Sequence, residues 1–323
     1  MMVSAVVPHW NRRELLETLL GNLPAQRRRF DEVIVVDNGS TDDSAECAER
    51  YGARVIRLQR NFGFATAVNR GIEAAGGEWV AILNNDVTLD AGWLAELLGH
   101  AGDAWFVTGK ILSAKDPRLI DGTFDEMSRG ACACRCGSGK PDSAFWNQPR
   151  EIRFAPMTAA LFRKRLFEEV GPLDERFGSY LEDVDFGVRC AVLRRAGMYV
   201  PGAVARHMGS ATHGAWNSDT VFRISRNQLL LAAKHLSGFP AWPKVAGQLL
   251  WGILALRHAR GGAWLRGKLS GWRAAREICG DGSGDQQNRL REILEASEQA
   301  IFDVGQQTGF DWYWRVYFWL LRR

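Results

Sequence analysis

Short apolar segments alternate with helix-like segments over the first hundred residues, and this alternation is the feature that most constrains the fold. Four runs have the length and composition of buried strands: residues 3–7, 33–36, 55–58 and 79–83. Segments with apolar residues at helical spacing lie between and after them: residues 12–20, 41–51, 65–75 and 89–98. Strict alternation of this kind predicts an α/β fold, with a mostly parallel sheet covered by helices on both faces.

Polar residues stand at the carboxyl ends of two of these strands, where ligands of such sheets bind. Asp37 follows the second strand, and Asn84-Asn85-Asp86 follows the fourth. Asp86 is placed to bind Mg²⁺ or Mn²⁺, which prefer oxygen ligands, or to cap the next helix. Asp37 could hydrogen-bond a base or ribose, or form the turn that Asn38-Gly39 favours.

Three carboxylates stand close together in Glu182-Asp183-Val184-Asp185. Acids crowded among apolar residues repel each other and are costly to remove from water. Such a cluster suits a general base that takes a proton from a hydroxyl group. The alternative is an acidic helix start, stabilised by the helix dipole, because residues 186–193 have helical spacing.

Histidines follow a predicted strand at residues 199–201. His207 is a candidate ligand for a metal or phosphate, and His213 competes with it. A lone histidine is also common as a purely structural residue. Residues 61–64, Asn-Phe-Gly-Phe, either let the backbone approach a ligand or form a simple loop.

Two other patterns do not support a site. Gly137-Ser138-Gly139-Lys140 lacks the first glycine of a phosphate-binding loop, and Pro141 replaces its Ser or Thr. Cys132, Cys134 and Cys136 lack the paired spacing of structural zinc sites, so a redox-sensitive loop is favoured there. No GxGxxG follows the first strand, which argues against a dinucleotide oxidoreductase.

The bulk composition places the chain among ordinary globular proteins. Of 323 residues, 46% are hydrophobic and 24% charged, and the net charge of +4 is too small to indicate a nucleic-acid partner. The first residues show no signal peptide, six cysteines do not form a disulfide scaffold, and no apolar run reaches the length of a membrane span. A cytoplasmic location is expected.

The expected domains are residues 1–238 and residues 239–323. The first would contain a nucleotide-binding half, about 1–100, and a second half, about 101–238, whose residues 113–150 read as loops. The second domain would be a helical, basic, Trp-rich extension. Residues 244–276 hold seven Lys or Arg and no acid, residues 280–287 read as a linker, and residues 310–323 are aromatic. This composition suits peripheral contact with the inner face of a membrane, and the alternatives are packing on the first domain or a homodimer contact.

Several motifs, taken together and in this order, resemble the family 2 glycosyltransferases of the GT-A fold. The closest likeness is to bacterial rhamnosyltransferases of cell-surface polysaccharide assembly, over about residues 3–236. The motifs are Val35–Asp42, Asn61–Gly71, Leu83–Val87, Val170–Phe177, Tyr180–Phe186, His207–Ser210 and Arg226-Asn227.

The resemblance implies a role for each matching residue. Contacts to the nucleotide would come from Pro8, Asn11, Asp37, Gly63, Asn69, Asn84 and Asn85. Asn84-Asn85-Asp86 matches the family's DxD metal motif with Asn in the first position. Asp86 and His207 would therefore hold Mg²⁺ or Mn²⁺, and Asp183 would be the catalytic base. Glu182 would hold the acceptor, with Thr158 and Ala159 near the sugar ring.

The implied activity is inverting, metal-dependent transfer of a sugar, rhamnose being one candidate. The donor would be a dTDP- or UDP-sugar, and the acceptor a hydroxyl of a glycan or of a lipid-linked molecule. The alternatives are a sugar nucleotidyltransferase and a non-catalytic nucleotide-sugar-binding or scaffold protein. The first would carry a Gly-rich loop after the first strand, where this chain has Pro8-His9-Trp10-Asn11. The presence of Asp86, Asp183 and His207 argues against the second.

Overall fold

The computed structural model describes residues 1–209, 216–278 and 284–321, and the chain forms two compact units. The sheet unit comprises residues 1–124 and 137–212, and the helical unit comprises residues 125–136 and 213–323. The longer segment of the helical unit therefore begins at residue 213, earlier in the chain than the boundary expected near residue 238. The reason is that helix α7 (Ser218–His235) packs closely against helix α9 (Gly261–Ala275).

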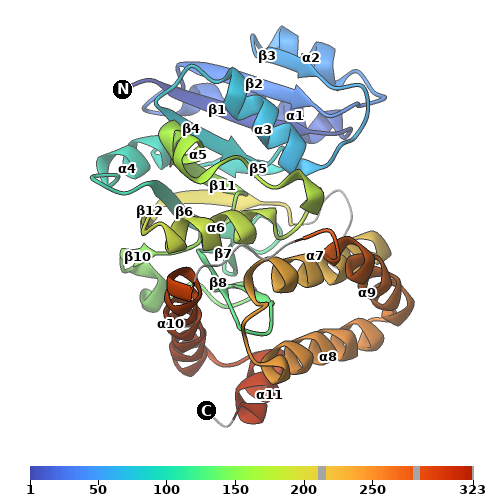
Figure 1. Cartoon of the computed structure of the whole chain (residues 1–323). Helices are drawn as coiled ribbons and strands as arrows, with labels where there is room; N and C mark the ends of the chain where they lie inside the picture. The colour runs from blue at the N-terminus through green and yellow to red at the C-terminus, as the bar shows by residue number, and fades with distance from the viewer. Residues whose placement is uncertain (210–215, 279–283, 322–323) are drawn as a thin grey trace. The chain divides into compact units, whose positions relative to one another are not determined.

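One mixed sheet of ten strands organises the sheet unit (Figure 1). The strands are β1 (Val3–His9), β2 (Glu32–Asp37), β3 (Arg54–Arg57), β4 (Trp79–Leu83), β5 (Val87–Leu89), β6 (Phe106–Ser113), β7 (Ile120–Gly122), β10 (Arg150–Ile152), β11 (Ala159–Arg163) and β12 (Gly197–His207). Their order is β10-β12-β6-β11-β4-β1-β2-β3, with β5 on β12 and β7 on β6. The α/β prediction is confirmed. The first four strands pair in parallel, and so do β6 and β12, whereas the remaining ladders of this sheet are antiparallel. Strand β11 runs antiparallel to both β4 and β6.

Most helices of the sheet unit lie close to their predicted positions, whereas α5 was not predicted. The helices are α1 (Arg13–Asn22), α2 (Ser44–Arg50), α3 (Phe64–Ala74), α4 (Trp93–Gly99), α5 (Lys164–Val170) and α6 (Glu182–Val192), with 3-10 helices η1 (Leu23–Ala25), η2 (Ala144–Asn147) and η3 (Glu175–Phe177). Helix α4 begins later than the expected residue 89, because residues 87–89 form β5 and pair with β12. Residues 113–150 also contain short strands where only loops were expected.

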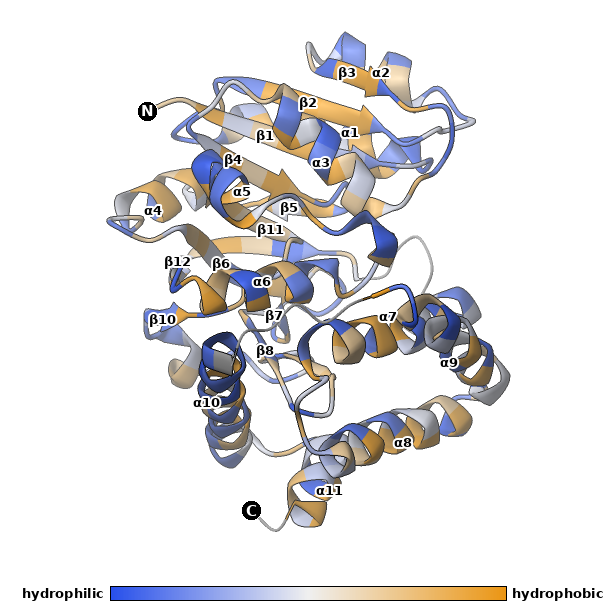
Figure 2. Cartoon of the chain, in the orientation of Figure 1, coloured by the Kyte–Doolittle hydropathy of each residue, from blue (hydrophilic) through white to orange (hydrophobic). Residues whose placement is uncertain are grey.

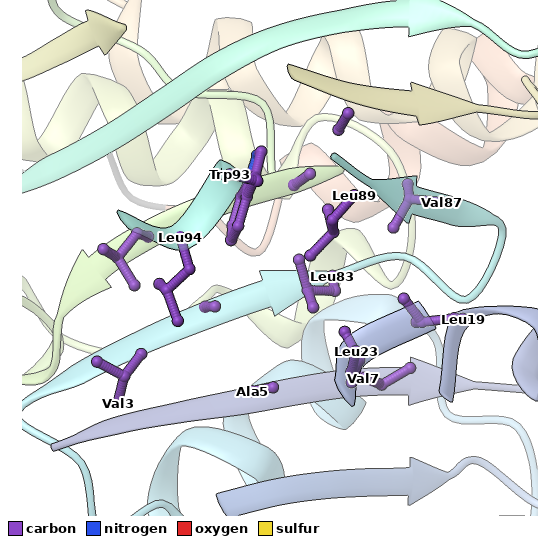
Figure 3. Close-up of a cluster of buried hydrophobic side chains, with 14 of the residues drawn as sticks. Val3, Ala5, Val7, Leu19, Leu23, Leu83, Val87, Leu89, Trp93 and Leu94 are labelled. Atoms are coloured by element: carbon purple, nitrogen blue, oxygen red, sulfur yellow. The ribbon is translucent and has the colours of Figure 1, made fainter. Parts of the chain in front are cut away.

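A buried apolar cluster fixes the turn between β4 and β5 (Figure 3). Strand β1 contributes alternate residues to it, as a strand with one face on a helix layer must. Leu83 at the end of β4 and Val87 at the start of β5 are both fully enclosed in this cluster. The polar residues 84–86 between them are therefore anchored at both ends.

Among its described residues, the helical unit contains a small hairpin and five helices. They are β8 (Asp125–Met127), β9 (Ala133–Arg135), α7, α8 (Ala241–Arg257), α9, α10 (Gly284–Thr308) and α11 (Trp312–Leu320). Buried Glu298 of α10 pairs with Arg129 of the hairpin at 2.7 Å and accepts a hydrogen bond from Tyr317 of α11 at 2.8 Å. The aromatic C-terminal segment is thus largely packed inside this unit. Of the predicted linker, residues 284–287 belong to α10, and residues 280–283 lie outside the described residues.

Candidate active site

The turn after β4 lies directly beside the start of β11. Ala159 pairs with Leu83 in the antiparallel ladder, and the Asn84 N–H donates to the carbonyl of Thr158 over 2.8 Å. Thr158 and Ala159 were both expected near the sugar ring. Ala159 is fully enclosed in the apolar core, where its side chain packs, and its place near the sugar ring stays a prediction. Thr158 is buried next to Asn84, so its predicted contact with the sugar ring stays a prediction.

Asp86 and His207, far apart in sequence, meet because β5 and β12 pair. His207 lies opposite Val87, and Nε2 of His207 is 3.1 Å from Oδ1 of Asp86. Nδ1 of the same imidazole lies 2.9 Å from Oδ2 of Asp121 on β7. Burial alone would lower the pKa of His207, but hydrogen bonds to Asp121 and Asp86 raise it to about 9.

Asp121 is a site residue that the sequence analysis missed. It lies in a stretch read as loop, and no spacing connects it to His207. The only local signal was an acid between an isoleucine and a glycine, Ile120-Asp121-Gly122.

The geometry of Asp86 and His207 fits a divalent ion. Ligands about 2.1 Å from one ion, at right angles, lie about 3 Å apart, close to the 3.1 Å between His207 Nε2 and Asp86 Oδ1. A hydrogen bond from Nδ1 to a carboxylate fixes the tautomer that leaves Nε2 for metal binding. Across the described residues no three His, Cys, Asp or Glu side chains form a metal-binding group. Two protein ligands suit Mg²⁺ or Mn²⁺, which keep other positions for water and phosphate.

The end of β2 forms a turn that is tied to the loop after β1. Oδ1 of buried Asp37 accepts from the Ser40 N–H at 3.1 Å, so the turn-forming alternative holds for that oxygen. Asn11 donates its N–H to the Ser40 hydroxyl and accepts from the Thr41 N–H, each over 2.8 Å. Pro8 is buried within β1 opposite Val36. Nucleotide contacts from Pro8, Asn11 and Asp37 remain predictions.

His9, at the end of β1, connects the end of β2 with the turn after β4. This role was not predicted from the sequence. His9 pairs with Asp37 in the parallel ladder, and its Nδ1 lies 2.8 Å from Nδ2 of Asn85. Burial lowers the pKa of His9 to about 4, despite the opposing attraction of Asp37. The imidazole is therefore neutral near pH 7, and it fixes the amide of Asn85.

Gly63 and Asn69 have structural roles. The amide nitrogen of Asn69 donates to the Leu173 carbonyl and to Glu175, and its oxygen accepts from the Leu173 N–H at 2.9 Å. With both ends engaged, Asn69 braces residues 173–175, and its contact with the nucleotide stays a prediction. Gly63, at φ +95°, lies where a Cβ would come within 2.7 Å of the Gly178 carbonyl oxygen. Its close backbone approach is to Gly178, and a contact with the nucleotide stays a prediction.

The three clustered acids have three different environments. Asp185 is fully buried and pairs with Arg189 at 3.0 Å, one helical turn on, so it is structural. Burial raises the pKa of Glu182 well above its usual value, and the negative charge of Asp183 adds to this. Asp183 is only half-buried, in the first turn of α6. Burial therefore favours the neutral form of Glu182, and Asp183 is the more accessible carboxylate.

A tight backbone turn brings these acids to the carboxyl edge of the sheet. Tyr180 and Leu181 both have positive φ, 74° and 68°, immediately before α6. The preceding segment is anchored to the start of α3, where the Ala65 N–H donates to the Gly178 carbonyl at 2.9 Å. Because α3 begins at the edge where the parallel strands end, Asp183 and the strand ends at Asp37 and Asp86 share one edge.

The sequence matches the family model described as glycosyl transferase family 2 over residues 4–171. The chain belongs to this family. The N-acetylglucosaminyl-diphospho-decaprenol L-rhamnosyltransferase of Mycobacterium tuberculosis is 31% identical to this glycosyltransferase over 270 residues, which is 75% of this chain and 87% of that one.

Two solved structures have the same fold as this glycosyltransferase. GalNAc-T7 with UDP, GalNAc and Mn²⁺ matches with a TM-score of 0.65 and 13% identity, over 93% of this chain and 57% of that chain. The mannosyltransferase PcManGT of Pyrobaculum calidifontis, with GDP-Man and Mn²⁺, matches with a TM-score of 0.54 and 17% identity, over 99% and 84%. The expected GT-A fold and glycosyltransferase class are therefore confirmed.

Three further features were noted in the sequence. His213, the competing histidine, and Ser210 of the histidine motif lie outside the described residues. Arg226-Asn227 belongs to α7 in the helical unit, where Nη1 of Arg226 donates to the Asn227 side chain at 2.7 Å. Cys132, Cys134 and Cys136 belong to the segment around β9, and the first and last are buried.

Proposed function

We propose that this glycosyltransferase acts by a single, inverting, metal-dependent displacement. The observation that carries the proposal is the pairing of Asp86 with His207, whose imidazole is in turn held by Asp121. This arrangement, together with the accessible carboxylate of Asp183, supplies the two parts that such a reaction needs.

Asp183 is proposed as the general base. Its carboxylate would accept the proton of the acceptor hydroxyl while that oxygen bonds to the anomeric carbon of the donor sugar. The bond from this carbon to the diphosphate oxygen breaks, and its electron pair leaves with the nucleoside diphosphate. Glu182 would hold the acceptor beside Asp183. Its buried Oε2 has no hydrogen-bond partner within the described residues.

Asp86 and His207 are proposed to hold Mg²⁺ or Mn²⁺ against the donor diphosphate. The ion would supply neutralisation of the charge that develops on the leaving group. The donor's nucleotide is proposed to lie along the ends of β1, β2 and β4, in contact with Asn11, Asp37 and Asn84.

The donor sugar and acceptor are proposed from the mycobacterial relative. Its name specifies an L-rhamnosyltransferase that acts on an N-acetylglucosaminyl-diphospho-decaprenol. We propose dTDP-rhamnose as the first donor to test, and a lipid-linked sugar diphosphate as the acceptor. Such an acceptor lies in a membrane, so the enzyme would work at its cytoplasmic face.

The proposal is tested in two steps. First, thermal shifts are measured with dTDP-rhamnose, UDP-glucose, UDP-galactose and GDP-mannose, each with and without Mn²⁺ or Mg²⁺. Ligand that binds the folded state raises the melting temperature by mass action. A metal-dependent shift with one donor names the donor, whereas no shift with any of them contradicts the proposed donor class.

The second step assays transfer by Asp183→Asn to a lipid-linked N-acetylglucosamine diphosphate in detergent. Loss of a general base lowers the rate by about 10²- to 10⁴-fold, while the donor-induced thermal shift should be retained. Asp103→Asn, at an exposed position beyond α4, is the matched control and should keep full activity. An Asp183→Asn enzyme with full activity would overturn the assignment of the base.

A further inference from the structure

On helix α9 the small residues are buried, and the large apolar side chains are exposed. Its buried residues are small: Ala263, Gly267 and Gly271, each four positions from the next. Cβ atoms at Gly267 and Gly271 would lie 2.4 and 2.5 Å from backbone carbonyl oxygens of α7. The large apolar residues of α9 lie on the opposite face and are exposed: Leu265, Leu269 and Trp272, at 52–54%.

Helix α8 repeats this pattern over a longer stretch. Its large exposed apolar residues are Trp242, Val245, Leu249, Ile253 and Leu256. At 100° per residue these five positions fall within an arc of about 80°. Its buried residues are mostly small, and a Cβ at Gly252 would lie 2.7 Å from Trp264 of α9, so the two helices pack closely. In Figure 2 most of α8 has hydrophobic colour, whereas α10 is mostly hydrophilic.

The charges on these two helices have one sign. From residue 244 to residue 276 there are seven Lys or Arg and no Asp or Glu. Arg257, Arg266, Arg273 and Arg276 are exposed, and Arg273 directly follows Trp272. A band of aromatic and aliphatic side chains bordered by arginine is typical of helices that lie in the headgroup region of a bilayer.

We propose that the exposed faces of α8 and α9 form a surface that binds anionic phospholipid. Single exposed apolar residues are ordinary in globular proteins, but a continuous exposed apolar face marks an interaction site. The absence of acids on both helices favours an anionic bilayer over a neutral apolar partner. The described helices include none long and apolar enough to span a membrane, so binding is at the bilayer surface. The inference rests on the proposed function in one respect, namely that a lipid-linked acceptor lies in a membrane.

The test is flotation of the full chain with vesicles of equal parts phosphatidylglycerol and phosphatidylcholine, and with phosphatidylcholine alone. Binding is expected to the anionic vesicles, and it should weaken with added salt because salt screens exposed charges. Leu249→Asp/Leu269→Asp should lower the bound fraction at least about tenfold. Arg266→Gln/Arg273→Gln should lower it by about tenfold and flatten the salt dependence.

A matched control separates the surface from the added charge. Tyr51→Asp/Leu193→Asp introduces the same two negative charges at exposed apolar positions of the sheet unit, and should bind vesicles like the wild type. All the substituted side chains are exposed, so far-UV circular dichroism and melting temperatures should be unchanged. The proposal is overturned if the wild type does not float, or if both Asp double variants bind equally.

A second copy of the chain is the main competing occupant of this surface. Sedimentation velocity without lipid would then show a dimer that Leu249→Asp/Leu269→Asp dissociates, and no vesicle binding by the wild type would accompany it. Transfer to an acceptor in detergent is measured in parallel on each variant. Vesicle binding can therefore fail while transfer persists, or persist while transfer fails, so the two proposals are judged separately.

Discussion

His207 donates a hydrogen bond from Nδ1 to Asp121 over 2.9 Å, across 86 positions of sequence. Asp121 lies on β7, which pairs with β6, and β6 pairs with β12, which ends at His207. This bond fixes the ring so that Nε2 faces Asp86. Asp121 would thereby orient His207, the proposed metal ligand, without contacting the ion itself.

Asp121→Asn should weaken metal-supported transfer. A neutral amide holds the imidazole less firmly, and loss of such a partner lowers metal affinity by about 10- to 100-fold. The measurement is a Mn²⁺ titration of transfer activity at saturating donor. Asp116→Asn is the control, because Asp116 pairs locally with Arg118 on the surface. An unchanged Mn²⁺ requirement in Asp121→Asn would contradict the role of Asp121.

Asp185→Asn should destabilise the fold. Asp185 is fully buried against Arg189, and breaking a buried pair costs about 3–5 kcal/mol in the free energy of unfolding. Arg189 also donates to the Val170 carbonyl at 2.8 Å, so we expect a loss at the lower end, about 3 kcal/mol. Urea unfolding measures this. Glu73→Gln, which removes an exposed partner of Arg70, should cost less than about 1 kcal/mol.

Gly63→Ala should be more costly than Gly52→Ala. Both glycines have positive φ, at +95° and +76°, so an added Cβ strains both backbones. Only at Gly63 would the new atom also clash, 2.7 Å from Gly178, whereas Gly52 has open space. We expect Gly63→Ala to lose at least about 2 kcal/mol of stability and Gly52→Ala about 1 kcal/mol. Equal losses in urea unfolding would show that the contact with Gly178 carries no energy.

Buried His9 should make the stability depend on pH. Burial lowers its pKa to about 4 in the folded state, against 6.5 when unfolded. Between these values the unfolded chain binds the extra proton, so stability falls as pH drops from 6.5 to 4, by about 3 kcal/mol. Urea unfolding at a series of pH values measures this slope.

The effect should be specific to His9. In His9→Gln the loss of stability between pH 6.5 and pH 4 should be smaller by about 3 kcal/mol. His100→Gln, at an exposed histidine, should leave the slope unchanged. An identical slope in His9→Gln and the wild type would show that His9 is not the titrating group.

Apart from β5, which depends on pairing with distant β12, the strands and helices of the first hundred residues could be predicted because their causes are local. Alternating apolar periods and turn residues specify each element from its own sequence, and parallel strands bring Asp37 and Asp86 to one edge. The order of several short motifs was also enough to indicate the family, which the comparisons confirm.

The tertiary structure decided what depends on contacts between distant segments. Strand β11 enters the sheet antiparallel, Asp121 reaches His207, and Asn69 braces residues 173–175 through pairings that no local pattern encodes. The three acids of residues 182–185 look alike in sequence, and burial and Arg189 give them different environments. Whether an apolar helix face is core or surface is likewise set by what packs against it. On α9 the close approach of α7 to Gly267 and Gly271 leaves the large side chains in solvent.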